Sequence, residues 1–153
     1  LDILAKRGMN LDLGGGTFLE ILFPDRDVSN FISNDGSVVA RLAYGDTSVI
    51  LTGDATIETE KIILQNSKPG ELASDVLKVG HHGSHTSTSP GFVKAVSPNF
   101  ALISDGKDNK YGHPHESVLE TLTEQGVQTL RTDLLGTIIM QSDGQNVSFS
   151  YKK

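Results

Sequence analysis

The residues 75–87, DVLKVGHHGSHTS, join a short apolar run to a turn that carries three histidines. The residues 48–55, SVILTGDA, have the same form, because an apolar run there ends in a glycine and the acidic residue Asp54. Runs of this length predict buried strands, and they alternate along the chain with segments of helical periodicity. The alternation is typical of an α/β domain, in which reactive side chains gather at strand ends.

The same patterns, followed outward in both directions, predict the remaining elements. The expected strands are residues 18–23, 37–44, 48–52, 75–79, 100–104, 127–131, 136–141 and 147–151. The expected helices are residues 56 to about 65, 90 to about 96, and 114 to about 124. Pro114 is placed in the first turn of the last helix, whose apolar stripe is Val118, Leu119 and Leu122. Gly45 and Asp46 predict a hairpin turn, and residues 28–36 predict a long loop.

The composition fits a single globular domain of 153 residues, with 37% hydrophobic and 21% charged residues. A net charge of −6 disfavours a broad surface for nucleic acid, because nonspecific duplex binding depends on Lys and Arg. No cysteine is present, which excludes disulfides and thiolate metal sites. The longest apolar runs are much shorter than the roughly 20 residues of a membrane span, so this stretch is expected to be soluble. The chain begins at Leu1 without a signal-like segment, which predicts that it belongs to a longer polypeptide.

Asp54 is a candidate metal ligand, because an apolar strand delivers its carboxylate to a strand end and Gly53 lets a ligand approach closely. The alternative is that Asp54 caps the next helix, a position that aspartate favours. A capping box would place Glu or Gln three residues later, where the chain has Ile57. All five histidines lie in residues 81–115, and this clustering favours a site for Zn²⁺ or Mn²⁺.

His81 and His82 follow the strand 75–79 and are candidate metal ligands. Neighbouring residues of a strand point to opposite faces, so an extended chain would leave only one of them as a ligand. His82 is favoured because it adjoins the turn at Gly83. The alternative is a solvated loop that happens to carry histidines. The hydroxyl of Ser84 is a candidate phosphate contact, and Ser84 is therefore a candidate catalytic residue.

Two further histidines, His113 and His115, lie in the stretch 109–115, NKYGHPH, directly before the last expected helix. The N-terminus of a helix favours the neutral imidazole, which suits a ligand or an electrophilic donor. The alternative is a surface loop whose proline starts a helix. A Ser-His-Asp triad is disfavoured, because the chain contains no Gly-x-Ser-x-Gly elbow.

Taken in order, these blocks resemble the metallo-β-lactamase superfamily and, within it, the C-terminal domain of ComEC-type DNA-internalisation competence proteins. The resemblance covers nearly the whole chain, and its most specific blocks are His-His-Gly-Ser at 81–84 and Tyr-Gly-His-Pro at 111–114. Further blocks lie at residues 34–37, 51–55, 75–80, 87–88, 104–106, 109, 131–133 and 136. The resemblance implies an αββα sandwich with a dinuclear Zn or Mn site between its sheets. In it, Asp54 bridges the metals and a histidine of the 81–82 pair is a terminal ligand.

The principal metal motif of that family, His-x-His-x-Asp-His, has no counterpart in this chain, because no histidine precedes His81. Residues 1–153 are therefore expected to form the C-terminal part of the domain. The expected architecture is mainly one mixed sheet with helices on one face. We expect such a fragment to be inactive by itself.

The resemblance also implies what the parent protein does. It would be a metal-dependent phosphodiesterase that acts on DNA during uptake, held in the cell membrane by a channel portion of the same polypeptide, with this domain outside the cytoplasm. His113 or His115 would protonate or stabilise the leaving oxygen, and Ser84 with Lys107 or Lys110 would steady the phosphate. One alternative is an exported hydrolase of phosphorylcholine or another small phosphodiester. The other is a non-catalytic interaction module of the same fold.

A single sheet with helices on one face would leave its second face uncovered. We expect Val39, Ile50 and Val79 to lie on that face, where the missing sheet would pack on them. Exposed apolar patches larger than a few hundred Å² are typical of interfaces. The chain is therefore expected to self-associate.

Overall fold

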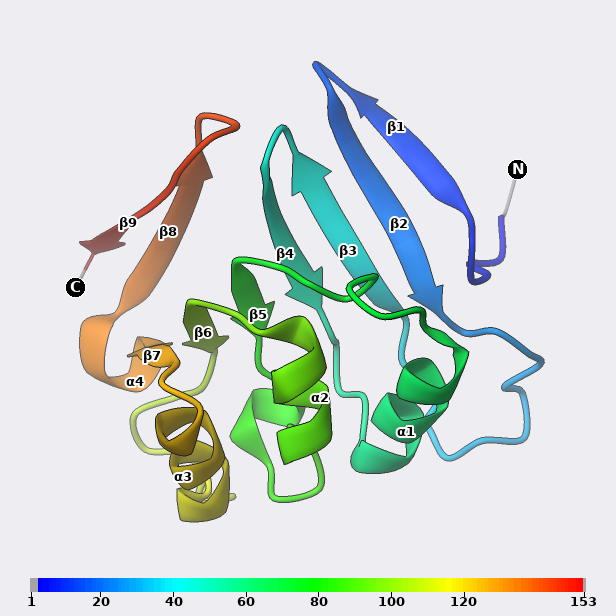
Figure 1. Ribbon diagram of the computed structural model, residues 1–153. Coiled ribbons are helices and arrows are strands. Elements are labelled where there is room, and N and C mark those ends of the chain that lie inside the picture. The colour runs from blue at the N-terminus through cyan, green and yellow to red at the C-terminus, as the bar shows by residue number, and fades with distance from the viewer. Residues whose placement is uncertain (1–2, 153) are drawn as a thin grey trace.

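A computed structural model describes residues 3–152 of the chain, so Leu1 lies outside the described residues. A mixed sheet of seven strands, in the order β1-β2-β3-β4-β5-β6-β7, forms its centre (Figure 1). The strands are β1 (Asn10–Gly14), β2 (Thr17–Phe23), β3 (Val39–Tyr44), β4 (Thr47–Leu51), β5 (Val76–Lys78), β6 (Phe100–Ile103) and β7 (Gln128–Arg131). From β1 to β4 neighbouring strands are antiparallel, whereas from β4 to β7 they are parallel. The carboxyl ends of β4 to β7 therefore meet at one edge, where α/β sheets hold their ligands.

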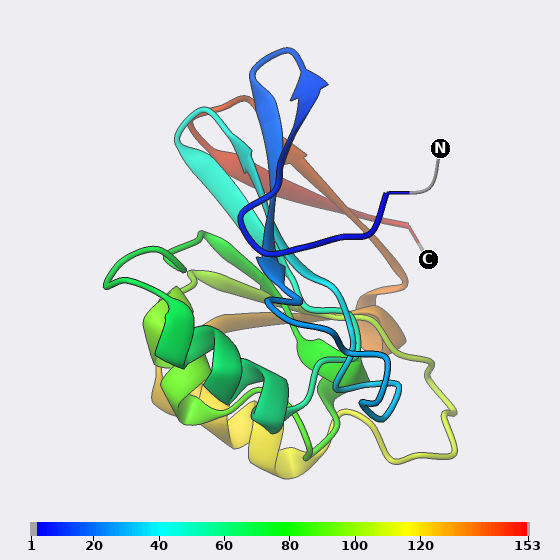
Figure 2. The same ribbon diagram turned by 90° about the vertical axis from the view of Figure 1, so that its right-hand side faces the viewer.

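Three helices cover one face of this sheet, and Figure 2 shows them together on one side. They are α1 (Ile57–Asn66), α2 (Pro90–Val96) and α3 (Glu116–Glu124). Their apolar side chains form one core with those of the sheet, and the helical members of this core are Ile63, Phe92, Val93, Val96, Val118 and Leu122. Two short elements follow strands, the 3₁₀ turn η1 (Gly80–Gly83) and the helix α4 (Thr132–Leu135). The predicted α/β fold with one main mixed sheet is confirmed.

A separate antiparallel hairpin, β8 (Thr137–Ser142) and β9 (Val147–Lys152), lies against the other face of the sheet. The ring of Phe149 is 4.9 Å from the ring of Phe100. Phe100 points away from the helices, because its strand neighbour Ala101 belongs to the core beneath them. The hairpin is also tied to the β3–β4 turn, where the Asp46 N–H donates to the Gly144 carbonyl over 2.7 Å.

The expectation that Val39, Ile50 and Val79 form an uncovered face is wrong. All three are 0% exposed and belong to the core beneath the helices. Strand alternation places Ala40 and Val49 on the opposite face, where each is only 6% exposed. The argument for self-association from those three residues therefore fails, and self-association remains an untested prediction.

Most predicted elements lie within two residues of their observed bounds, with two differences. Strand β1 was not predicted, although Leu11 and Leu13 alternate there with polar residues; all five of its residues are exposed. Pro114 lies before helix α3 and not in its first turn. His115 is the N-cap, in an extended conformation, because its N–H donates to the Gly83 carbonyl over 2.9 Å.

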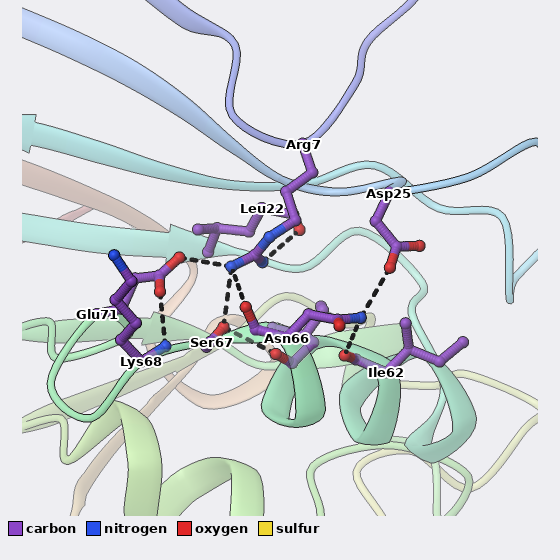
Figure 3. A network of polar contacts seen from close by, with 9 residues as sticks. Arg7, Leu22, Asp25, Ile62, Asn66, Ser67, Lys68 and Glu71 are labelled. Carbon is purple, nitrogen blue, oxygen red and sulfur yellow. Dashed lines mark hydrogen bonds and ion pairs between the residues drawn. The ribbon is translucent and has the colours of Figure 1, made fainter.

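Arg7 joins the segment before β1 to the end of helix α1 (Figure 3). Its guanidinium donates to the Leu22 carbonyl over 3.0 Å and to the Asn66 carbonyl over 2.8 Å. It also forms an ion pair with Glu71 over 2.5 Å. A fork of donors on one cation can satisfy several acceptors at once, including the helix-end carbonyl of Asn66 that α1 leaves unpaired.

Within residues 3–152, no helix is both long and apolar enough to cross a bilayer.

Replacing Arg7 with alanine is expected to lower the free energy of unfolding by about 2 kcal/mol, because hydrogen bonds that involve a charged group contribute roughly that much. Urea denaturation followed by circular dichroism measures the change. Arg26→Ala is the matched control, because among residues 3–152 the exposed side chain of Arg26 pairs only with its neighbour Asp25. Equal effects of the two substitutions would contradict the structural role of Arg7.

Candidate functional site

A cavity of about 480 Å³ opens at the sheet edge where the carboxyl ends of β4, β5 and β6 meet. Its size lies within the range of pockets that bind small molecules and cofactors. Its lining comes from the loops after those strands and consists of Asp54, His81, His82, Ser104, Asp105, Gly106, Asn109, Tyr111 and His113. The structure therefore brings together Asp54 with three of the five histidines.

Backbone hydrogen bonds hold these loops in register with one another. The His81 N–H donates to the Gly53 carbonyl over 3.1 Å, which joins the loop after β5 to the loop after β4. The His115 N–H donates to the Gly83 carbonyl over 2.9 Å, which joins the loop after β6 to the turn η1. The positions of the cavity side chains are thus fixed by the backbone as well as by their own contacts.

The turn η1 corrects the argument from strand alternation. His81 and His82 both adopt left-handed backbone conformations, with φ of 45° and 56°. Strand β5 ends at Lys78, so the extended chain does not continue through the pair. Both imidazoles consequently line the cavity. A left-handed conformation is uncommon for residues other than glycine, and it persists only where surrounding contacts hold it.

His82 is oriented toward Asp54 by a contact on the far side of its ring. Its Nδ1 lies 2.5 Å from the Ser104 carbonyl oxygen, and its Nε2 lies 3.6 Å from Oδ1 of Asp54. A carbonyl oxygen can only accept, so Nδ1 carries a proton, and Nε2 is the ring nitrogen that faces Asp54. Metal-binding histidines are commonly oriented by an acceptor at the other nitrogen in this way.

His81 has a polar neighbour at each ring nitrogen. Its Nε2 lies 3.4 Å from Nδ2 of Asn34, and its Nδ1 lies 3.4 Å from Oγ1 of Thr86. Asn34 belongs to the predicted loop 28–36 between β2 and β3. Sequence reasoning included Asn34 in the family blocks but did not identify it as a site residue, because nothing local indicates that it reaches a histidine so far along the chain.

The carboxylate of Asp54 is half exposed, with 46% of its side chain accessible. The interpretation of Asp54 as a helix cap is wrong, because the N-cap of α1 is Thr56. The hydroxyl of Thr56 bonds to the carboxylate of Asp35. Burial lowers the pKa of the neighbouring Lys78, and the charge of Asp54 opposes this shift. Asp54 is therefore free of any capping role and available to a ligand in the cavity.

Asp105 is a cavity residue that sequence reasoning did not select. Its Oδ1 is buried and has no hydrogen-bond partner among the described residues, while its Oδ2 accepts from Nδ2 of Asn109 over 3.3 Å. Burial raises the pKa of this carboxyl group, and the charge of Asp133 raises it further. Asp105 follows the end of a strand closely, as Asp54 does, and this position could have identified it as a candidate site residue.

Asn109 organises the loop after β6, and sequence reasoning did not assign it this role. Its amide nitrogen donates to the carbonyls of Gly106 and His113 over 2.9 and 2.7 Å. Its amide oxygen accepts from the N–H groups of Tyr111 and His113 over 3.2 and 3.0 Å. A single side chain thus fixes the backbone that presents Tyr111 and His113 to the cavity.

His113 lines the cavity, whereas His115 does not. The ring of His115 instead packs edge-on against His85, with centroids 4.7 Å apart. Burial lowers the pKa of His113, and the neighbouring histidines lower it further, beginning with His115. A pKa below the ordinary value favours the neutral imidazole of His113. The main cause is burial and not the start of a helix.

Three other candidates are not brought to the cavity wall. Ser84 is buried, and its hydroxyl contacts the hydroxyl of Thr86 over 3.0 Å. The side chain is enclosed by its own turn, and the expected phosphate contact stays an untested prediction. Lys107 and Lys110 lie on the exposed loop that carries Tyr111 and do not line the cavity.

Glu60 is a buried residue of α1 that binds the segment following η1. Its buried carboxylate accepts from the N–H groups of Thr88 and Ser89 over 2.5 and 2.8 Å, and so holds the segment between η1 and α2 against α1. Burial raises the pKa of Glu60, whereas these hydrogen bonds oppose that shift. Sequence reasoning missed this role, because an acidic residue in a helix is normally on the surface.

The raised pKa of Glu60 predicts a specific dependence of stability on pH. The folded state holds this proton more tightly than the unfolded state, so the contribution is present below the unfolded pKa near 4.5 and is lost as pH rises through the folded value. Wild type should therefore lose stability relative to Glu60→Gln as pH rises above 4.5. Urea denaturation of both proteins from pH 4.5 to 7.5 measures the difference, and a constant difference would refute the assignment.

Comparison with known proteins gives relatives that share a segment of similar sequence. The chain is 46% identical over 105 residues to ComE operon protein 3 of Bacillus subtilis (strain 168), covering 69% of this chain and 13% of that protein. It is 39% identical over 123 residues to competence protein ComA of Neisseria gonorrhoeae, covering 80% of this chain and 18% of that protein. It is 42% identical over 107 residues to recombination protein 2 of Haemophilus influenzae, covering 70% of this chain and 13% of that protein. The chain thus spans less than a fifth of the length of each relative. No family model matches it.

Proposed function

We propose that this chain is part of a ComEC-type competence protein, and that its cavity contributes to a divalent-metal-dependent phosphodiesterase of the metallo-β-lactamase superfamily acting on DNA. The observation that carries the chemistry is the pairing of Asp54 with His82. The Nε2 atom of His82 lies 3.6 Å from Oδ1 of this half-exposed carboxylate at the carboxyl edge of the sheet. The relatives named for competence and recombination support the part concerning DNA uptake.

The donor set fits a divalent cation in part. Carboxylate oxygen and neutral imidazole nitrogen are ligands that Zn²⁺ and Mn²⁺ both accept. Asp54 and His82 would hold the cation, and Asp105 lines the same cavity, although its unpartnered Oδ1 is buried. Within residues 3–152, however, no group of three or more such side chains is placed to hold a metal ion. The proposal of two metal ions per complete domain therefore requires further ligands from outside the described residues.

A bound divalent cation supplies Lewis acidity that activates water for attack on phosphorus. The residues of this chain would orient the reacting groups. His113, kept neutral by burial, would donate a hydrogen bond to the leaving oxygen, and Asn109 would hold the backbone of His113 in place. Asp105 would accept a proton, because its raised pKa brings the carboxyl group closer to neutral pH. His81 would be held by Asn34 and Thr86.

Two alternatives follow from specific observations. The net charge of −6 suits a small phosphodiester such as an ester of phosphorylcholine better than a long polyanion. The lack of a complete ligand group among the described residues suits a non-catalytic module of the same fold. In the first alternative the parent would be an exported hydrolase, whereas in the main proposal it would be anchored in the cell membrane by its channel portion.

Purified full-length protein tests the proposal directly. We expect Mn²⁺ or Zn²⁺ to bind, and we expect cleavage of DNA that stops when the metal is chelated and returns when it is restored. Phosphorylcholine esters and bis(p-nitrophenyl) phosphate form the comparison panel. Cleavage of small diesters without DNA cleavage would favour the first alternative. A protein that binds no metal and cleaves no substrate would favour the alternative of a non-catalytic module.

A further inference from the structure

Tyr111 is an exposed aromatic residue at the mouth of the cavity. Its side chain is 66% exposed, although the residue contributes to the cavity lining. The hydroxyl group has no hydrogen-bond partner among the described residues. An exposed aromatic ring beside a cavity is a surface on which a flat ligand can stack.

The fold does not need the ring of Tyr111. The backbone of the loop is fixed by Asn109, which accepts the Tyr111 N–H and both accepts from and donates to the backbone of His113. The ring stacks on His113 with an interplanar angle of 27° and a centroid distance of 5.8 Å. The ring therefore forms a flat surface next to the cavity. The backbone of Tyr111 is held in place by Asn109.

The charges around Tyr111 favour stacking over electrostatic attraction. Lys107 and Lys110 lie on the same loop, but Asp105 and Asp108 offset them, so the loop offers no net positive patch. The ammonium of Lys110 lies 5.3 Å from the centroid of the Tyr111 ring. Its flexible stem would let this ammonium move to a phosphate when a planar ligand occupies the ring.

We infer that Tyr111 is a stacking platform for an unpaired nucleobase of the DNA substrate, which places single-stranded DNA next to the cavity. The inference rests on the proposed function and specifies its substrate. Stacking of bases on aromatic side chains is tolerant of sequence and does not require a basic surface. A platform of this kind would let an acidic domain grip DNA locally, by a base beside the phosphate that enters the cavity.

The test uses full-length protein with Mn²⁺, a short single-stranded oligonucleotide containing 2-aminopurine, and an abasic oligonucleotide of the same length, which keeps the phosphates but has no base. Tyr111→Ala should raise KM for the oligonucleotide about tenfold, equivalent to about 1.4 kcal/mol, and should weaken quenching of 2-aminopurine. The KM for the abasic oligonucleotide should rise much less, because that substrate has no base to stack on the ring. Tyr111→Trp should retain oligonucleotide binding. Tyr151→Ala, which removes an exposed tyrosine of β9, is the matched control.

Each other result overturns the inference. Equal losses on both substrates would show that Tyr111 only positions His113, on which it stacks. An unchanged KM for the oligonucleotide would show that the ring does not contact DNA. Failure of the proposed function is separate, because wild type would then hydrolyse neither substrate. Quenching of 2-aminopurine would still decide whether a base stacks on Tyr111.

Discussion

Asp54→Asn in the full-length protein is expected to lower metal-dependent turnover by about a thousandfold or more. Asparagine keeps the shape of the side chain but removes the negative charge that would hold the cation, and metal-activated catalysis contributes several kcal/mol to the lowering of the barrier. Metal content should fall in parallel. Folding stability should change little, because Thr56 and not Asp54 occupies the N-cap of α1.

Single-turnover assays, metal analysis and thermal denaturation measure these three quantities. Asp108→Asn is the matched control, because Asp108 lies on the exposed loop after β6 and does not line the cavity. Retained turnover with a lowered melting temperature would contradict the role of Asp54 as a ligand. It would also restore the interpretation that this residue stabilises the start of the helix.

Gly83→Ala is expected to lower the free energy of unfolding by about 2–4 kcal/mol and to disrupt the cavity. A Cβ at Gly83 would lie 2.6 Å from the Cβ of Pro114, and the backbone there has a φ of +82°. Left-handed strain and overpacking each contribute roughly 1–3 kcal/mol. Because Pro114 lies between His113 and His115, the displaced turn would move His113 away from the other cavity residues.

Gly70→Ala is the control that separates the two causes. Gly70 has a φ of +81°, nearly the same as that of Gly83, but a Cβ there would have no atom within 4 Å. Gly70→Ala should therefore show only the cost of the backbone conformation, about 1 kcal/mol. Denaturant unfolding of both variants measures the difference. If the two variants lose equal stability, the contact between Gly83 and Pro114 is not what holds the loops together.

Local pattern was sufficient to predict the strands that carry the site. The apolar runs before Asp54 and before His81 predicted β4 and β5 within a residue or two of their bounds, because burial on both faces requires continuous apolar sequence. The clustering of histidines predicted that several of them would meet, and three do line one cavity. The order of strands and helices indicated an α/β sheet, and the structure has one.

Long-range contacts decided what local pattern could not. Val39, Ile50 and Val79 lie on the face of the sheet that the helices cover. Strand alternation shows which residues share a face, but it does not show which face the helices cover. Glu60 is buried only because the backbone of residues 88–89 turns its N–H groups toward α1. Asn109 is a local exception, because it bonds to backbone groups within four residues of itself, but the periodicity of apolar residues does not mark such contacts.

The sequence by itself determined which residue types gather at the carboxyl edge of the sheet, because strand periodicity and strand order are properties of short segments. Only the tertiary structure decided how these side chains are aimed. His81 and His82 line the same cavity because a hydrogen bond from His81 to Gly53, in another loop, accompanies their left-handed turn. His82 faces Asp54 because the carbonyl of Ser104, on a third loop, fixes its ring. Such orienting bonds join residues distant in sequence, and no local pattern encodes them.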